Sequence, residues 1–207
     1  MVAGVVVAAI LTAATGTVGT LLGGTTGLLI GLAVGLVLGV VLGWAVTTSD
    51  SYDLRSRAGM VEFVLDLTWS LPNTFLGALY LALNLVFGNR LERTYARHTG
   101  SVQLAHGVFP RLNGVTYLTT VGTVVAGVDP AVHHHEYGHI LQARIFGPCY
   151  VPLVLANYVI ATVVPFWWLY HNHTRYPIRK IADYFMAGVY PHIWNEEWCY
   201  RVYGPPR

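Results

Sequence analysis

The N-terminal quarter of the chain is uniformly apolar. Residues 1–49 contain no Lys, Arg, Asp, Glu or His, and the first charged side chain is Asp50. Within this segment glycine recurs at every fourth position from Gly19 to Gly43. On a helix this spacing keeps the glycines on one slowly drifting face. Each would cost about 1 kcal/mol relative to alanine in water, whereas in lipid a glycine face lets helices approach closely. The pattern predicts a membrane-type glycine zipper.

The length of this segment predicts a helical hairpin. One straight helix over residues 1–48 would reach about 70 Å, whereas the hydrocarbon core of a bilayer is about 30 Å thick. A turn near Gly23-Gly24-Thr25-Thr26 would give two spans of suitable length. The alternative is a buried hairpin in a soluble oligomer. We expect a membrane location, with lipid and further copies of the chain, through the glycine faces, as partners. A cleaved signal peptide is not expected, because the basic n-region is missing.

The remaining chain divides into a connector and a C-terminal domain. Residues 49–98 predict a helical connector, because a polar hinge is followed by an apolar stretch too short for a span. The segments 101–109 and 114–121 are rich in β-branched and aromatic residues and predict a hairpin, continued by residues 123–126. A helix is expected from Ala131 to Phe146, with Asp129 as its N-cap. Residues 145–170 predict a buried, kinked packing segment, and a last helix is expected over 176–189. The fold class is therefore mostly α with a small β-hairpin or sheet.

Composition narrows the classes of function. Hydrophobic residues make up 54% and charged residues 11% of the chain, and a typical soluble domain is about 25% charged. This deficit favours membrane contact. The net charge is only +2 and no Lys/Arg-rich run is present, so no nucleic-acid partner is expected. Cys149 and Cys199 are predicted to be buried free thiols, with a disulfide as the alternative.

One motif carries recognisable chemistry. The stretch His135-Glu136-Tyr137-Gly138-His139 matches H-E-x-x-H. Positions i and i+4 share a helical face, so both imidazoles can bind one Zn²⁺. Zinc lowers the pKa of a bound water to about 7. Glu136 can accept its proton, and the resulting hydroxide can attack an amide carbonyl. The site residues predicted on this basis are His135 and His139 as ligands and Glu136 as the general base. The other interpretation is a polar, histidine-rich helix face.

The motif and its flanks resemble a known group. His135 to Gln142, followed by Gly147-Pro148-Cys149-Tyr150, resembles bacterial zincin-like, gluzincin-like metallopeptidase-related proteins with H-E-Y-G-H-x-x-Q and then G-P-x-Y. The resemblance covers about residues 100–190. It implies a minimal zincin-like domain within residues 99–207. It also implies a later helix with the pattern E-x-x-A-D, in which Glu is the third zinc ligand and Asp orients a ligand histidine.

The third ligand is where this chain departs from the resemblance. Ala182 and Asp183 match the A-D pair, but Arg179 stands at the position of the ligand Glu. A guanidinium has no lone pair to offer a metal. We therefore predict Asp183 as the third ligand. Two alternatives stay open, namely that Glu196 or Glu197 folds back to the metal, or that the site is degenerate and not hydrolytic.

Two functions follow from these features. The first is a membrane-associated zinc metallopeptidase-like protein that acts on a peptide or protein substrate. The second is a membrane-inserting, pore-forming or toxin-like component, in which the glycine zipper is functional and the zincin site is degenerate.

Overall fold

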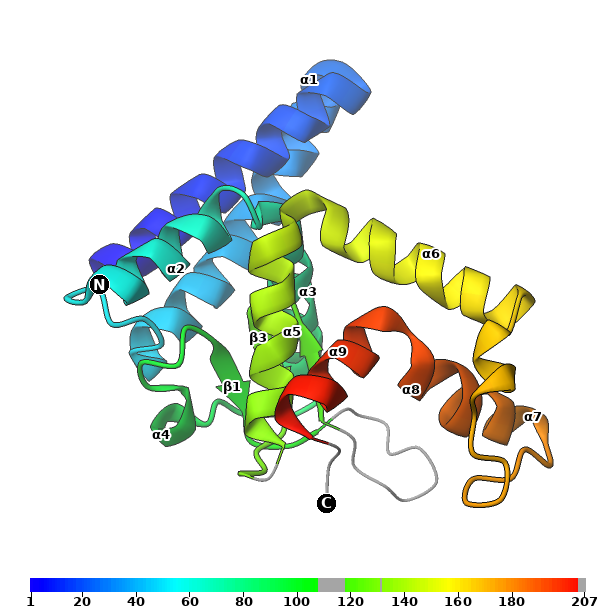
Figure 1. The fold of residues 1–207 in the computed structure, drawn as a ribbon. Helices are drawn as coiled ribbons and strands as arrows, with labels where there is room; N and C mark the ends of the chain where they lie inside the picture. Colours follow the sequence, from blue (N-terminus) through cyan, green and yellow to red (C-terminus); the bar gives the residue numbers. More distant parts are fainter. Residues whose placement is uncertain (108–117, 131, 205–207) are drawn as a thin grey trace.

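The computed structural model describes residues 1–107, 118–130 and 132–204. It is mostly helical with one small sheet, as predicted (Figure 1). The α-helices are α1 (Val2–Ser49), α2 (Arg57–Leu67), α3 (Leu71–Val86), α4 (Arg93–Ala96), α5 (His133–Phe146), α6 (Tyr150–Val163), α7 (Ile181–Asp183), α8 (Tyr190–His192) and α9 (Trp194–Tyr203). Two 3₁₀ turns, η1 (Gly147–Cys149) and η2 (Phe166–Leu169), and a π-helix, η3 (Tyr184–Val189), connect them. The strands are β1 (Val102–Leu104), β2 (Thr119–Val121) and β3 (Val124–Ala126).

The N-terminal segment forms the predicted hairpin. The backbone of α1 leaves helical geometry at Gly23 and Gly24, and Gly24 has a positive φ of 57°. Figure 1 shows the two arms lying side by side, with the turn at the end remote from the rest of the molecule. A positive φ is open to glycine without steric cost, which explains why the turn falls at this pair.

The repeated glycines lie between the two arms. A Cβ atom placed on any of them, apart from those in the turn, would overlap the opposite arm. The facing pairs are Gly19 with Gly27, Thr15 with Gly31, Ala8 with Gly39, and Gly4 with Gly43. The absence of side chains therefore permits backbone-to-backbone packing within one chain. Self-association through the same glycine faces remains a prediction, and it would require the arms to separate.

The open end of the hairpin packs on the rest of the protein. Leu11 and Leu42 from the two arms are fully buried, and they belong to the same apolar core as Leu81 of α3 and Leu104 of β1. Side chains from residues 1–48, 49–98 and 99–207 thus contribute to a single core.

The sheet differs from the predicted hairpin. Its strand order is β1-β3-β2, with β1 parallel to β3 and β2 antiparallel to β3. The prediction that residues 101–109 pair with 114–121 is wrong for the described part, because β1 does not neighbour β2. Residues 108–117 lie outside the described residues. Instead β2 and β3 form a hairpin across Gly122 and Thr123, and Gly122 has a φ of 57°. A two-residue loop of this kind favours glycine at positive φ.

The C-terminal half also departs from its predicted boundaries. Helix α5 ends at Phe146 as expected, but it begins at His133 with Val132, not Asp129, as the N-cap. The single helix predicted over 176–189 is replaced by α7 and η3, and α9 follows where no helix was predicted. Both cysteines are free; Cys199 is buried as predicted, whereas Cys149 is exposed.

Helix α6 is not the buried packing segment that was predicted. Ala161 is the one buried residue along it. Its exposed apolar side chains are Leu153, Leu155, Val159, Ile160 and Val163. Figure 1 shows α6 running outward from the end of α5, so that much of its surface has no protein partner. The composition predicted burial, but the neighbouring elements pack only against its inner side.

Among the described residues, two helical stretches are long and apolar enough to cross a membrane. They are Val2–Ser49 and His133–Val163, each of which contains an 18-residue stretch with a mean hydropathy of 2.5 and 1.5, respectively. Length and composition are the only criteria here, and a buried core helix or a signal sequence also meets them. The first stretch is folded back at Gly23, and the second bends at Gly147, where φ is 53°.

Candidate metal centre

Helix α5 presents its motif histidines to α9. His135, His139 and Gln142 occupy one face of α5, since they are spaced by four and three residues, and all three are buried. Helix α9 begins at Trp194 and turns Glu196 and Cys199, also three residues apart and also buried, towards that face. In Figure 1 α9 lies against the N-terminal half of α5. The two helices thus bring four chemically active side chains together.

Three donor groups converge at the centre of this contact. The Nε2 atoms of His135 and His139 are 3.2 Å apart. The Glu196 carboxylate places Oε2 3.1 Å from the first of these atoms and Oε1 3.3 Å from the second. Zinc binds nitrogen and oxygen at about 2.0–2.2 Å, which makes the edge between two tetrahedral ligands about 3.3–3.5 Å. The observed separations approach such edges.

Glu196, and not the predicted Asp183, is the carboxylate that approaches the two histidines. It was one of the alternatives for the third ligand, and its carboxylate is almost completely buried. Burial raises its pKa, but hydrogen bonds and the charges of His135 and His139 outweigh this effect and lower the pKa to about 2. The group is therefore a carboxylate at neutral pH, the form that binds metals. The sequence signal that could have pointed to Glu196 is a pair of glutamates within an aromatic segment that contains Trp194, Trp198 and Tyr200.

Asp183 does not join the two histidines. Its Oδ2 accepts hydrogen bonds from the backbone N–H groups of Arg179 and Lys180, at 3.1 and 3.2 Å, and so caps the start of α7. Figure 1 places α7 at the far end of the C-terminal segment from α5. Glu197 also points away from the centre and pairs with Arg201 on its own helix. The place expected for Asp183 is taken by Glu196.

Cys199 lies beside the centre, on the other side of the His139 ring. His135, His139 and Cys199 form a buried group that could hold a metal ion. The Cys199 Sγ, however, lies 3.7 Å from Nδ1 of His139, whereas Nε2 of that ring faces His135 and Glu196. From the sequence Cys199 was predicted only to be a free thiol, because its proximity to His139 depends on how α9 packs against α5.

Comparison adds nothing to this geometry. No family model, curated protein or solved structure matches the chain.

Glu136 is placed to serve a ligand bound at the same centre. It is buried, and its Oε2 accepts a hydrogen bond of 2.7 Å from Thr120 Oγ1 on β2. Glu136, His139 and Glu196 line a cleft of about 590 Å³. The walls of the cleft are largely apolar and include Leu76, Val151, Val154, Leu155 and Met186. The cleft brings Glu136 and the ligand groups within reach of one bound molecule.

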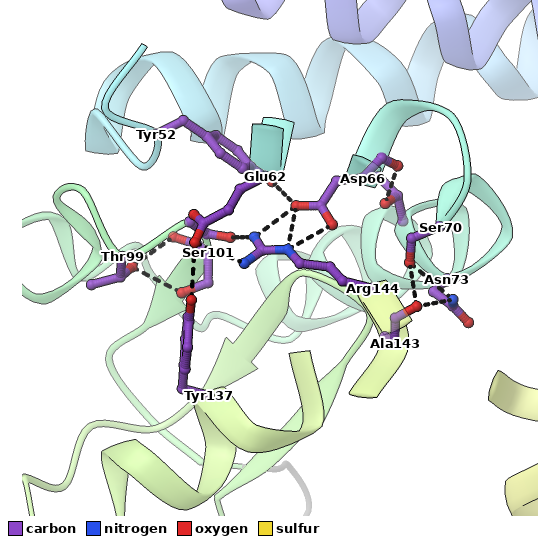
Figure 2. Close-up of polar contacts among 12 residues, drawn as sticks. Tyr52, Glu62, Asp66, Ser70, Asn73, Thr99, Ser101, Tyr137, Ala143 and Arg144 are labelled. Atoms are coloured by element: carbon purple, nitrogen blue, oxygen red, sulfur yellow. Dashed lines mark hydrogen bonds and ion pairs between the residues drawn. The ribbon is translucent and has the colours of Figure 1, made fainter. Parts of the chain in front are cut away.

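The opposite face of α5 is anchored by a buried ion pair (Figure 2). Arg144 donates from Nε and Nη2 to the Asp66 carboxylate, at 3.0 and 2.8 Å, and from Nη2 to the carbonyl of Gly100 at 2.6 Å. Tyr52 donates to the same Asp66 carboxylate at 2.8 Å. Tyr137, two turns before Arg144 on α5, donates to Glu62 at 3.0 Å. These contacts fix the rotation of α5 about its axis and thereby aim the histidines at α9.

The C-terminal end of α5 is held by the junction between α2 and α3. Ser70 Oγ donates to the carbonyl of Ala143 at 3.0 Å, and Asn73 Nδ2 donates to the carbonyl of Gly147 at 2.7 Å. Both carbonyl groups also accept a backbone hydrogen bond, from Gly147 and Tyr150 respectively. The two side chains therefore add second partners, which tie the end of α5 to the start of α3.

Proposed function

We propose that this chain is a membrane-associated zinc metallopeptidase or a related amide hydrolase. The observation that carries the proposal is the convergence of His135, His139 and Glu196 at ligand-to-ligand separations of 3.1–3.3 Å. Two histidines and one glutamate are a ligand set found in catalytic zinc sites, which keep the fourth position open. The donor set therefore fits zinc, and the gluzincin-like resemblance of the motif agrees with it.

The residues around the centre have distinct roles in this proposal. Bound zinc would supply a Lewis acid that polarises a carbonyl group and acidifies water. Glu136 would accept the proton of the attacking water and pass it to the leaving amine. Thr120 holds one oxygen of Glu136, and the other oxygen would accept that proton. The apolar cleft walls would exclude bulk water and accommodate a peptide or protein substrate.

Glu136→Gln tests the proposal directly. The amide keeps the size of the side chain but cannot accept the proton. General base catalysis contributes about 10²–10⁴-fold to rate. We expect the full-length variant in detergent to retain zinc, measured by elemental analysis, and to lose hydrolysis of a peptide library by that factor. His139→Ala is the matched control that should lose both zinc and hydrolysis. A wild-type protein without zinc, or a Glu136→Gln variant of full activity, would refute the proposal.

A further inference from the structure

Gln142 lies one turn beyond His139, and its amide is fully buried between α5 and α9. Its Nε2 donates to the backbone carbonyl of Asn195 at 2.8 Å and contacts the Cys199 Sγ at 3.4 Å. Its Oε1 is 3.2 Å from His139 Nδ1 and accepts from the Tyr150 hydroxyl at 3.3 Å. Both hydrogens and both lone pairs of the amide thus have partners.

The Asn195 contact determines which way the amide faces. A backbone carbonyl can only accept a hydrogen bond, so the NH₂ group of Gln142 has to point at Asn195. Its Oε1 then faces His139, and an amide oxygen can only accept. His139 must therefore carry its proton on Nδ1. In a neutral imidazole the other nitrogen then bears the lone pair, and that nitrogen, Nε2, is the one that faces His135 and Glu196.

The same residue also controls the position of α9. Asn195 immediately precedes Glu196, so the hydrogen bond from Gln142 holds the first turn of α9 against α5. His135 has no equivalent support, because its Nδ1 is buried without a hydrogen-bond partner among the described residues. The Gln142 amide therefore orients the His139 ring and also holds the turn that carries Glu196.

We infer that Gln142 is the positioning residue of the metal centre, which selects the metal-binding tautomer of His139 and holds Glu196 in place through Asn195. The inference rests on the proposed zinc site. Groups that hydrogen-bond a ligand histidine in this way typically contribute about 10–100-fold to metal affinity.

The test compares Gln142→Met with Gln142→Glu in the full chain. Methionine keeps the length of the side chain and removes every hydrogen bond, whereas glutamate keeps an acceptor for Nδ1–H. The first readout is the tautomer of His139 in the metal-free protein, from ¹⁵N chemical shifts of labelled histidine recorded at alkaline pH, where the ring is neutral. The second is zinc affinity, measured by competition with a chelator. We expect Gln142→Met to give mixed tautomers and to bind zinc about 10–100-fold more weakly, and Gln142→Glu to keep the Nδ1–H tautomer.

Tyr150→Phe is the matched control, since it removes a partner of the same Oε1 but leaves the bond to His139. Both readouts should remain at wild-type values in this variant. An unchanged tautomer and an unchanged zinc affinity in Gln142→Met would overturn the inference, as would loss of the Nδ1–H tautomer in Gln142→Glu. A wild-type protein that binds no zinc would refute the proposed function. The tautomer comparison would still decide whether Gln142 orients His139, because it uses the metal-free protein.

Discussion

The α1 hairpin and the α5–α9 pair both depend on two helices that approach closely, but for opposite reasons. In the hairpin, glycines remove side chains so that backbones touch, as at Gly19 and Gly27. In the metal centre, large polar side chains fill the space between the helices, and each needs a specific partner. The hairpin contact repeats the same backbone approach along its length, whereas the centre depends on single contacts such as the 3.1 Å approach of Glu196 to His135.

This difference bears on the two functions suggested by the sequence. A membrane-inserting component that assembles through its zipper needs glycine faces that are free to meet another chain. Here those faces lie between the arms of one hairpin. The unpartnered apolar surfaces are instead the outer side of the hairpin and α6, including Leu22, Val37 and Ile160. These surfaces suit lipid contact, which agrees with the membrane location that we propose for the hydrolase.

The largest effect is expected from breaking the centre at Glu196. Structural zinc sites bind with about 10–16 kcal/mol through four ligands, so one ligand contributes about 3 kcal/mol, or about 100-fold in affinity. We expect Glu196→Gln to weaken zinc binding by about that factor, measured by chelator competition. Glu197→Gln, on the next residue and paired with Arg201, should bind zinc as the wild type does. Equal affinities in the two variants would show that Glu196 is not a ligand.

A smaller effect is expected from one methyl group in the hairpin. Gly31→Ala should stabilise a free helix by about 1 kcal/mol. Its Cβ would, however, overlap the backbone of Thr15 on the opposite arm. Overpacking of this kind costs about 1–3 kcal/mol, so we expect a lower unfolding temperature in detergent and an unchanged zinc affinity.

Gly23→Ala is the matched control for the hairpin. A Cβ at Gly23 meets no atom within 4 Å, and its φ of −147° lies outside the positive region that disfavours alanine. This variant should unfold at the wild-type temperature. If Gly31→Ala changed the oligomeric state and left the unfolding temperature unaltered, the glycine face would act between chains and not within one.

The two regions also differ in how far the sequence predicts them. The hairpin is encoded locally, because period-four glycines specify a close helical face and the Gly23-Gly24 pair specifies the turn. The placement of His135 and His139 follows equally from their spacing on one helix. Glu196, by contrast, lies 61 residues after His135. Its contact with the histidines depends on how α6, η3 and α8 lead the chain back to α5, and no local pattern describes that path.

The incorrect predictions have the same origin. The strand pairing was assigned between neighbouring apolar segments, but the tight turn at Gly122 and Thr123 pairs β2 with β3 and leaves β1 to add in parallel. Asp183 was favoured because it lies near a familiar pattern, yet its carboxylate caps a local turn. Burial of α6 was preferred to a membrane span because Pro148, Pro152 and Pro165 interrupt the uncharged segment and Asn157 lies within it. These residues do not distinguish a core helix from one whose outer side is exposed.

The smallest effect should come from Cys199, which distinguishes the two ligand sets that the centre offers. If His135, His139 and Glu196 hold the metal, Cys199 contacts no ligand atom but only the far nitrogen of His139, at 3.7 Å, and Gln142 Nε2, at 3.4 Å. A neutral contact of this kind contributes about 0.5–1.5 kcal/mol. Cys199→Ser should therefore reduce zinc affinity by about tenfold or less. If Cys199 were the third ligand, the loss would approach the roughly 100-fold expected for Glu196→Gln.

Cobalt substitution gives an independent check, because a thiolate ligand produces intense charge-transfer absorption that histidine and glutamate do not. We expect no such band in the wild-type protein. Its presence there, and its loss in Cys199→Ser, would assign the thiol to the metal and leave Glu196 as a hydrogen-bond partner of the two histidines.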